Sequence, residues 1–203
     1  MRKTRNILFW LLIGLLADLP SQAIQTMHAR LGGKLVIVKF DPKAHDTIRI
    51  LDMQSHEIYR GMPKSLHPWK VQVADADGDG REDIAVGVYK KARFHPVMAK
   101  RLFIYGWDGK GLYPKWLGSR LARPFTDFVF LDRKLVAIEV TRDGMNELAV
   151  YRWDGFGFTG EWAGVKSPKL SGLTADHSRI IVQSGSRTMK FTFKGYQLQE
   201  VKS

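Results

Sequence analysis

The chain contains no cysteine among its 203 residues, which excludes disulfide bonds, thiolate metal sites and cysteine nucleophiles. Histidine is also sparse: the six histidines occur singly, and none has the H-x-x-x-H spacing of a metal-binding helix. The sequence has no G-x-S-x-G motif, phosphate-binding loop or dinucleotide fingerprint. The familiar signatures of an enzyme are therefore missing, although a pair of carboxylates that meets only in the folded chain stays open.

Negative charge is in short supply. The chain has 32 Lys and Arg against 20 Asp and Glu, a net charge of +12 at pH 7. A surface of this kind favours anionic partners. In an exported protein we expect these to be an acidic glycan, an envelope polymer or lipid headgroups, and not nucleic acid. The alternative is that the charge only keeps the protein soluble.

Long apolar runs are scarce, with one exception at the N-terminus. The basic segment Met1–Asn6 precedes an apolar run, Ile7–Ala17, and Ser21-Gln22-Ala23 places small residues at the −3 and −1 positions of a cleavage site. We therefore expect a signal peptide at 1–23 and a mature domain at 24–203, in a protein that is periplasmic, displayed on the cell surface or secreted. The run is short for a bilayer span of roughly 20 residues, and an uncleaved membrane anchor is the alternative.

The rest of the chain lacks a long amphipathic helix. Short alternating or apolar runs are separated by Gly, Asp-Gly, Pro and Lys-rich turns, the pattern of an all-β protein. The expected strands are 34–40, 47–53, 69–75, 83–89, 101–107, 127–132, 134–140, 147–153, 170–176, 179–185 and 188–194.

These strands form a repeat. In three successive units the first strand ends in an aspartate: Asp75, Asp132 and Asp176. In two of them the third strand enters a Trp-Asp-Gly hairpin: Trp107–Gly109 and Trp153–Gly155. An earlier unit fits the later half of the pattern, with its first strand expected around 23–27. Four units of four strands predict a β-propeller of about four antiparallel blades, with a sandwich or barrel as the alternative.

The segment DADGDGRED, residues 75–83, concentrates carboxylates in this basic chain. Its aspartates alternate along a tight loop, so their side chains can converge, and its two glycines let the backbone turn without a Cβ clash. Hard oxygen ligands at this density suit Ca²⁺ and not zinc. The predicted ligands are the carboxylates of Asp75, Asp77, Asp79 and Asp83 and the backbone carbonyl of Arg81.

The start of this loop also matches a helix–loop–helix calcium site, but that interpretation fails downstream. Position 12 needs a bidentate Glu and holds Val86, and the residues 84–88 that follow are apolar and strand-forming. The loop therefore joins two strands, and we expect Glu82 to point outward. The alternatives are a solvated acidic turn without an ion and a catalytic metal site. A catalytic role has little support, because the sequence places no general base nearby.

The D-x-D-G-D-G-x-x-D loop, the apolar strand after it and the strand that ends in Trp-Asp-Gly together resemble FG-GAP or VCBS repeats. These repeats are the blades of integrin-α-like β-propellers. The resemblance is specific over Asp75–Gly87 and weakens along 123–203, where the blade pattern persists without the acidic loop. It implies one calcium ion held by the ligands named above, in a structural role, and metal-free blades elsewhere.

Two basic segments are candidates for binding an anionic ligand. The first, 89–103, is expected as a long loop between two strands, and the second is 114–125. The candidate residues are Lys90, Lys91, Arg93, Lys100, Arg101, Lys115, Arg120 and Arg123. Trp116 lies among them, and we expect it to pack within a blade.

These features favour an exported, non-enzymatic binding protein with one structural calcium loop. Its partner is expected to be a protein or an anionic envelope or glycan surface. The alternative is a small exported enzyme that acts on polysaccharide through a carboxylate or Tyr/Arg site on the propeller face. A third option, an anchored envelope-assembly subunit, requires residues 7–17 to remain in the mature protein.

Overall fold

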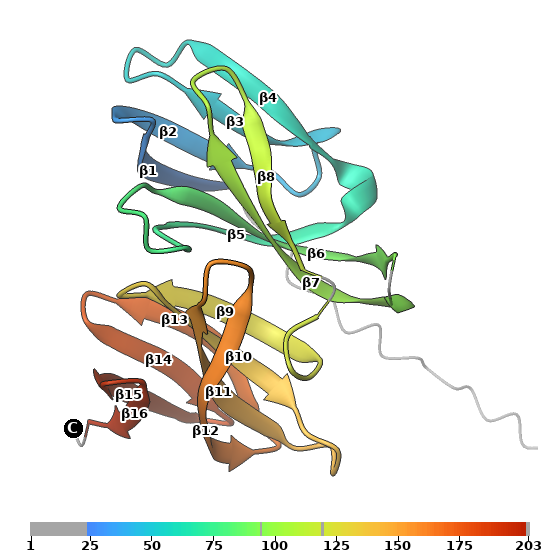
Figure 1. Ribbon diagram of the computed structural model, residues 1–203, viewed down its shortest axis with the longest axis vertical. Coiled ribbons are helices and arrows are strands. Elements are labelled where there is room, and N and C mark those ends of the chain that lie inside the picture. The colour runs from blue at the N-terminus through green and yellow to red at the C-terminus, as the bar shows by residue number, and fades with distance from the viewer. Residues whose placement is uncertain (1–23, 94, 119, 202–203) are drawn as a thin grey trace, which may run out of the picture.

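The structure is a computed structural model that describes residues 24–93, 95–118 and 120–201, and the expected signal peptide lies outside these residues. Sixteen strands form four antiparallel sheets, each with its four strands in chain order. The sheets are arranged as the blades of a four-bladed β-propeller (Figure 1). The predicted fold class is therefore confirmed. We number the sheets as blades 1 to 4 along the chain.

Each blade takes one contiguous stretch of sequence. Blade 1 contains β1 (Gln25–Leu31), β2 (Lys34–Phe40), β3 (Asp46–Leu51) and β4 (Glu57–Pro63). Blade 2 contains β5 (Pro68–Ala74), β6 (Asp83–Ala92), β7 (His95–Trp107) and β8 (Leu112–Leu117). Blade 3 contains β9 (Phe125–Leu131), β10 (Lys134–Val140), β11 (Asn146–Trp153) and β12 (Phe158–Ser167). Blade 4 contains β13 (Leu170–Asp176), β14 (Arg179–Ser184), β15 (Arg187–Lys194) and β16 (Gln197–Glu200).

The hydrophobic pattern of each strand reflects how many faces of its blade are covered. Strand β2 of blade 1 alternates, with Val36, Val38 and Phe40 buried and the residues between them partly exposed. Strand β10 of blade 3 is instead buried continuously over Leu135–Ile138. Among the described residues, three hydrophobic clusters join blade 1 to blade 2, blade 2 to blade 3 and blade 3 to blade 4. The two middle blades therefore bury both faces, which requires unbroken apolar runs.

The cluster between blades 2 and 3 contains Trp116, as expected for a packing residue. Its ring meets the edge of Phe158, with the ring centroids 5.0 Å apart, and it also contacts Trp153 of blade 3. Edge-to-face pairs of this kind add to the stabilisation that comes from burial. Trp116 is thus part of the interface between two blades.

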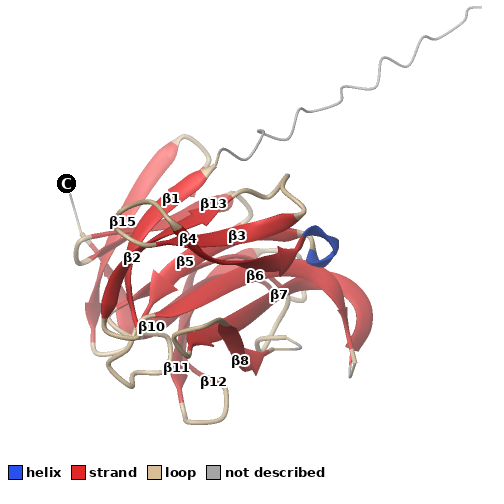
Figure 2. Ribbon diagram, turned by 90° about the horizontal axis from the view of Figure 1, so that it is seen from above, coloured by secondary structure: helices blue, strands red, loops and turns tan. Residues whose placement is uncertain are grey.

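The expected long loop in the basic segment 89–103 is wrong. Strands β6 and β7 continue as a narrow antiparallel hairpin, in which Tyr89 pairs with Lys100 and Lys90 with Ala99. The Lys-Lys and His-Pro signals were misleading because Pro96 occupies a bulge, where the ladder needs no N–H donor. The hairpin projects beyond the rest of blade 2, at the right of Figure 1, and it curves away from the sheets in Figure 2.

Candidate functional site

The acidic loop connects β5 to β6, at the opposite end of blade 2 from the projecting hairpin (Figure 1). Ala76 is fully buried and anchors the loop on the core, while Gly78 and Gly80 have φ of 77° and 84°. These positive values lie in the left-handed region that residues with a Cβ adopt at a cost. The two glycines thus allow the loop to form a tight turn.

Three of the four predicted aspartate ligands converge in the loop. One carboxylate oxygen from each of Asp75, Asp77 and Asp79 lies within 4.8 Å of the other two. The same carboxylates also accept hydrogen bonds from the backbone of the loop. Asp75 accepts one from the Gly80 N–H at 3.1 Å, and Asp79 accepts one from the Arg81 N–H at 2.8 Å. This cluster could hold a metal ion.

Two buried oxygens of the loop have no hydrogen-bond donor among the described residues. Within the described part of the chain, Asp75 Oδ1 and Asp83 Oδ2 are buried and accept no hydrogen bond. Asp83 is only 1% exposed, and burial raises its pKa to about 6. A buried carboxylate oxygen without a donor costs free energy that a coordinated cation would offset. The site therefore has unused acceptors of the hard type that Ca²⁺ prefers.

Lys115 of β8 already supplies one positive charge to this loop. Its Nζ lies 2.7 Å from Asp77 Oδ2, 2.9 Å from Asp83 Oδ1 and 3.1 Å from Asp79 Oδ2, and its side chain is 13% exposed. Burial opposes the charge, but the three carboxylates together raise the pKa of Lys115 above its usual value. We predicted Lys115 as a residue for anionic ligands, and it instead neutralises the acidic loop.

The other residues of the loop face blade 1. Arg81 is exposed and lines a cavity of about 580 Å³ together with Arg30 and Trp107. The carboxylate of Glu82, which we expected to point outward, accepts a hydrogen bond from the Arg30 N–H on β1. Glu82 therefore connects the loop to the neighbouring blade.

The remaining basic candidates divide into two groups. Lys91, Arg93 and Arg120 are exposed, and Lys90 is partly exposed with its Nζ 5.6 Å from the centroid of the Phe103 ring. The others have internal partners. Lys100 Nζ donates to the Thr126 carbonyl at 2.5 Å and lies 4.1 Å from the centroid of the Trp69 ring.

Arg101 and Arg123 belong to the second group. Arg101 is 1% exposed and donates to backbone carbonyls within the hairpin, so it does not face solvent as we had expected. Arg123 pairs with Glu147 at 2.5 Å. The first group is therefore the more exposed to solvent, whereas the second is engaged within the fold.

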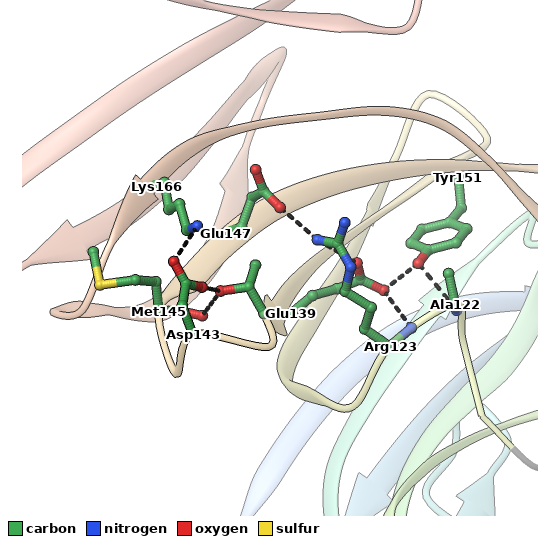
Figure 3. A network of polar contacts seen from close by, with 9 residues as sticks. Ala122, Arg123, Glu139, Asp143, Met145, Glu147, Tyr151 and Lys166 are labelled. Atoms are coloured by element: carbon green, nitrogen blue, oxygen red, sulfur yellow. Dashed lines mark hydrogen bonds and ion pairs between the residues drawn. The ribbon is translucent and has the colours of Figure 1, made fainter.

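A buried Glu–Tyr pair escaped the sequence analysis (Figure 3). The Tyr151 hydroxyl donates to Glu139 Oε1, and the same oxygen accepts the Arg123 N–H at 3.2 Å, while the Ala122 N–H donates to the Tyr151 oxygen at 3.2 Å. The two residues border a cavity of about 280 Å³. No local signal marked them: Tyr151 pairs with Leu135 and Glu139 with Glu147, so the Tyr151 side chain reaches Glu139 diagonally across β10 and β11.

The hydrogen bonds of this pair hold the backbone in place. Burial raises the pKa of Tyr151, and its bond to Glu139 raises it further. Burial likewise raises the pKa of Glu139. The pair binds the backbone of Ala122 and Arg123, so it fixes the connection between blades 2 and 3.

Comparisons with known proteins place this chain in no family. None of the known protein-family models matches it, and no curated protein matches it. Among solved structures, one described as "Structure of a Xanthomonas Type IV Secretion System related protein" is similar at 12% identity and a TM-score of 0.32. That alignment covers 90% of this chain and 87% of the other. At this TM-score the likeness carries no inference about fold or function.

Among the described residues, no helix has the length and apolar character needed to cross a bilayer.

Proposed function

We propose that this chain is an exported, non-enzymatic binding protein built on a propeller of the FG-GAP/VCBS type, with one structural calcium ion. Its partner is a protein or an anionic envelope or glycan surface. The observation that carries the proposal is the β6–β7 hairpin, which extends beyond its blade and presents Lys90, Lys91 and Arg93. A projecting basic element on a rigid scaffold is suited to recognition, because its contacts are accessible and held in place.

Calcium is assigned to the loop between β5 and β6, with Asp75, Asp77, Asp79, Asp83 and the Arg81 carbonyl as ligands. The buried, unpaired oxygens of Asp75 and Asp83 support this assignment. The ion would neutralise carboxylates and hold the start of β6, whose far end forms the projecting hairpin. Its role is structural, since the basic residues of the hairpin lie at the opposite end of the strand.

A binding role is favoured over catalysis on polysaccharide. The buried carboxylate beside a cavity, Glu139, is engaged by Tyr151 and by the Arg123 N–H. Glu139 and Tyr151 direct their hydrogen bonds at each other and at the backbone N–H groups of Ala122 and Arg123, so neither meets a substrate without giving up an internal partner.

The metal assignment is tested by calcium titration with thermal unfolding as the readout. The purified protein should unfold at a higher temperature with calcium than with a chelator, and Asp79→Ala should lose most of that shift. An unchanged melting temperature in both proteins would refute the assignment.

The binding assignment is tested on an immobilised sulfated glycan, heparin, and on acidic peptides. The triple variant K90Q/K91Q/R93Q should bind both more weakly than K169Q/K190Q/K194Q, which removes the same charge from three exposed lysines, two in blade 4 and one in the turn that leads into it. Equal binding by the two variants would show that the hairpin has no special role.

A further inference from the structure

The hairpin contains a bulge that displays apolar side chains. Lys90 pairs with Ala99, and Ala92 pairs with His95. Between these pairs β6 has the single residue Lys91, whereas β7 has the three residues Pro96, Val97 and Met98. The extra residues are forced out of the ladder. Val97 is 55% exposed and Met98 is 39% exposed.

A buried arginine fixes the shape of this bulge. Arg101 is 1% exposed. Its guanidinium donates to the Val97 carbonyl at 2.8 Å, to the His95 carbonyl at 3.2 Å and to the Lys90 carbonyl at 3.3 Å, and it lies 2.9 Å from His95 Nδ1. Within the described part of the chain it forms no ion pair with a carboxylate. The planar fork of donors thus binds carbonyls on both strands of the hairpin.

Burial of an unpaired guanidinium is costly, and a solvated loop has no need of it. Protection of a free strand edge does not account for it either. Lysines, a proline and a bulge are enough to prevent another strand from pairing with a free edge, and this protection does not require exposed apolar side chains. What Arg101 adds is a single conformation for Val97 and Met98, which lowers the entropy lost when a partner covers them.

The chemistry of the tip identifies the kind of partner. Exposed Val97, Met98 and Tyr89 lie on the same hairpin as exposed Lys91 and Arg93. A sulfated or uronic-acid polymer would pair with the cations but leave the apolar groups in water. A protein surface with an apolar residue beside carboxylates would satisfy both.

We propose, on the basis of the function proposed above, that the bulge Pro96–Met98 held by Arg101 is the docking element for an acidic partner protein. Val97 and Met98 bury against its apolar residues, and Lys91 and Arg93 pair with the surrounding carboxylates. This narrows the partner from any anionic surface to a protein.

The probe is a phage-displayed library of random 12-residue peptides selected on the immobilised protein, with the recovered peptides synthesised for measurement of Kd. We expect sequences in which an apolar residue adjoins Asp or Glu. The variant V97S/M98S should weaken their binding by about tenfold or more. The matched control M53S/I58S removes two apolar groups of similar exposure, 43% and 44%, from blade 1 and should leave Kd unchanged.

A second variant separates shape from contact. R101M leaves the exposed side chains in place and should weaken the same peptides, with its folding checked by circular dichroism. If R101M fails to fold, V97S/M98S decides alone. Recovery of no acidic–apolar peptide, or equal Kd for V97S/M98S and wild type, overturns the proposal, as does a dimer of the protein that V97S/M98S dissociates.

The outcomes also distinguish this inference from the proposed function. Heparin binding that is lost in K90Q/K91Q/R93Q but kept in V97S/M98S, with no peptide recovered, would refute the protein partner and retain an anionic polymer. If no hairpin variant changes the binding of any probe, the proposed binding function itself fails.

Discussion

Replacing Lys115 with Gln is expected to lower the stability of the calcium-free protein and to tighten its binding of calcium. Lys115 Nζ contacts three carboxylates, those of Asp77, Asp79 and Asp83, at 2.7 to 3.1 Å. A calcium ion that uses the same oxygens must displace the ammonium group. On the proposed calcium assignment the two cations compete for one loop, and the effects of the substitution have opposite signs in the presence and absence of calcium.

The contacts set the size of both effects. Loss of one partner of a largely buried ion pair costs about 3–5 kcal/mol. For a domain of this size, each kcal/mol shifts the melting temperature by about 2–4 °C, so K115Q without calcium should unfold roughly 6–20 °C lower. The gain in calcium affinity is smaller, because a displaced ammonium regains its hydration. About 10- to 100-fold in Kd is expected, equivalent to about 1.4–2.7 kcal/mol.

The assay combines isothermal titration of calcium into chelator-treated protein with thermal unfolding at several calcium concentrations. The control is K110Q, which removes an exposed lysine from the neighbouring β7–β8 turn and should change neither quantity. Since stabilisation follows RT ln(1 + [Ca²⁺]/Kd), calcium should raise the melting temperature of K115Q by more than that of the wild type. If K115Q binds calcium as the wild type does, or more weakly, then Lys115 does not compete with the ion.

Three further predictions concern stability. The pKa of Glu139 is raised by burial, so the stability gained from its neutral form is complete below about pH 4.5, its unperturbed value, and is lost as pH rises through the higher folded value. Denaturant unfolding across pH should accordingly show a flatter profile for E139Q, and a parallel profile would refute this. A Cβ at Gly87 would lie 2.6 Å from the Trp69 ring and 2.9 Å from Phe128, so G87A should cost about 1–3 kcal/mol; an unchanged unfolding midpoint would contradict the packing. Phe128 is fully buried and Phe156 is exposed, hence F128A should cost about 3–5 kcal/mol and F156A little, and comparable losses in chemical denaturation would argue against the blade interface described.

The blades could be read from the sequence because their signals are local. Strand periodicity, the aspartate at the end of each first strand and the Asp-Gly hairpins depend on residues a few positions apart. The first strand of blade 1 was the least defined of these, since QTMHARL mixes polar and apolar residues and only its later part is buried. The projecting hairpin was predicted as a loop because Lys-Lys and Pro look like turn signals until a pairing partner is known.

The candidate sites were readable only where their residues are neighbours in sequence. The aspartates of the acidic loop lie within nine residues, so their convergence followed from alternation and glycine alone. Lys115 belongs to β8 and reaches the loop because β8 pairs with β7 next to β6. Glu139 and Tyr151 meet across β10 and β11. No spacing rule predicts contacts of this kind, which depend on register and on side-chain direction.

The sequence by itself determined an all-β chain, its division into four repeating units and the acidic loop, because these follow from local backbone preferences and from short-range alternation. Only the tertiary structure decided which of the many cations are exposed. Lys115 and Arg101 carry the same charge in the sequence as Lys91 and Arg93, but the fold uses the first two for its own carboxylates and carbonyls and leaves the others exposed. That division depends on which strands lie side by side, and composition does not contain it.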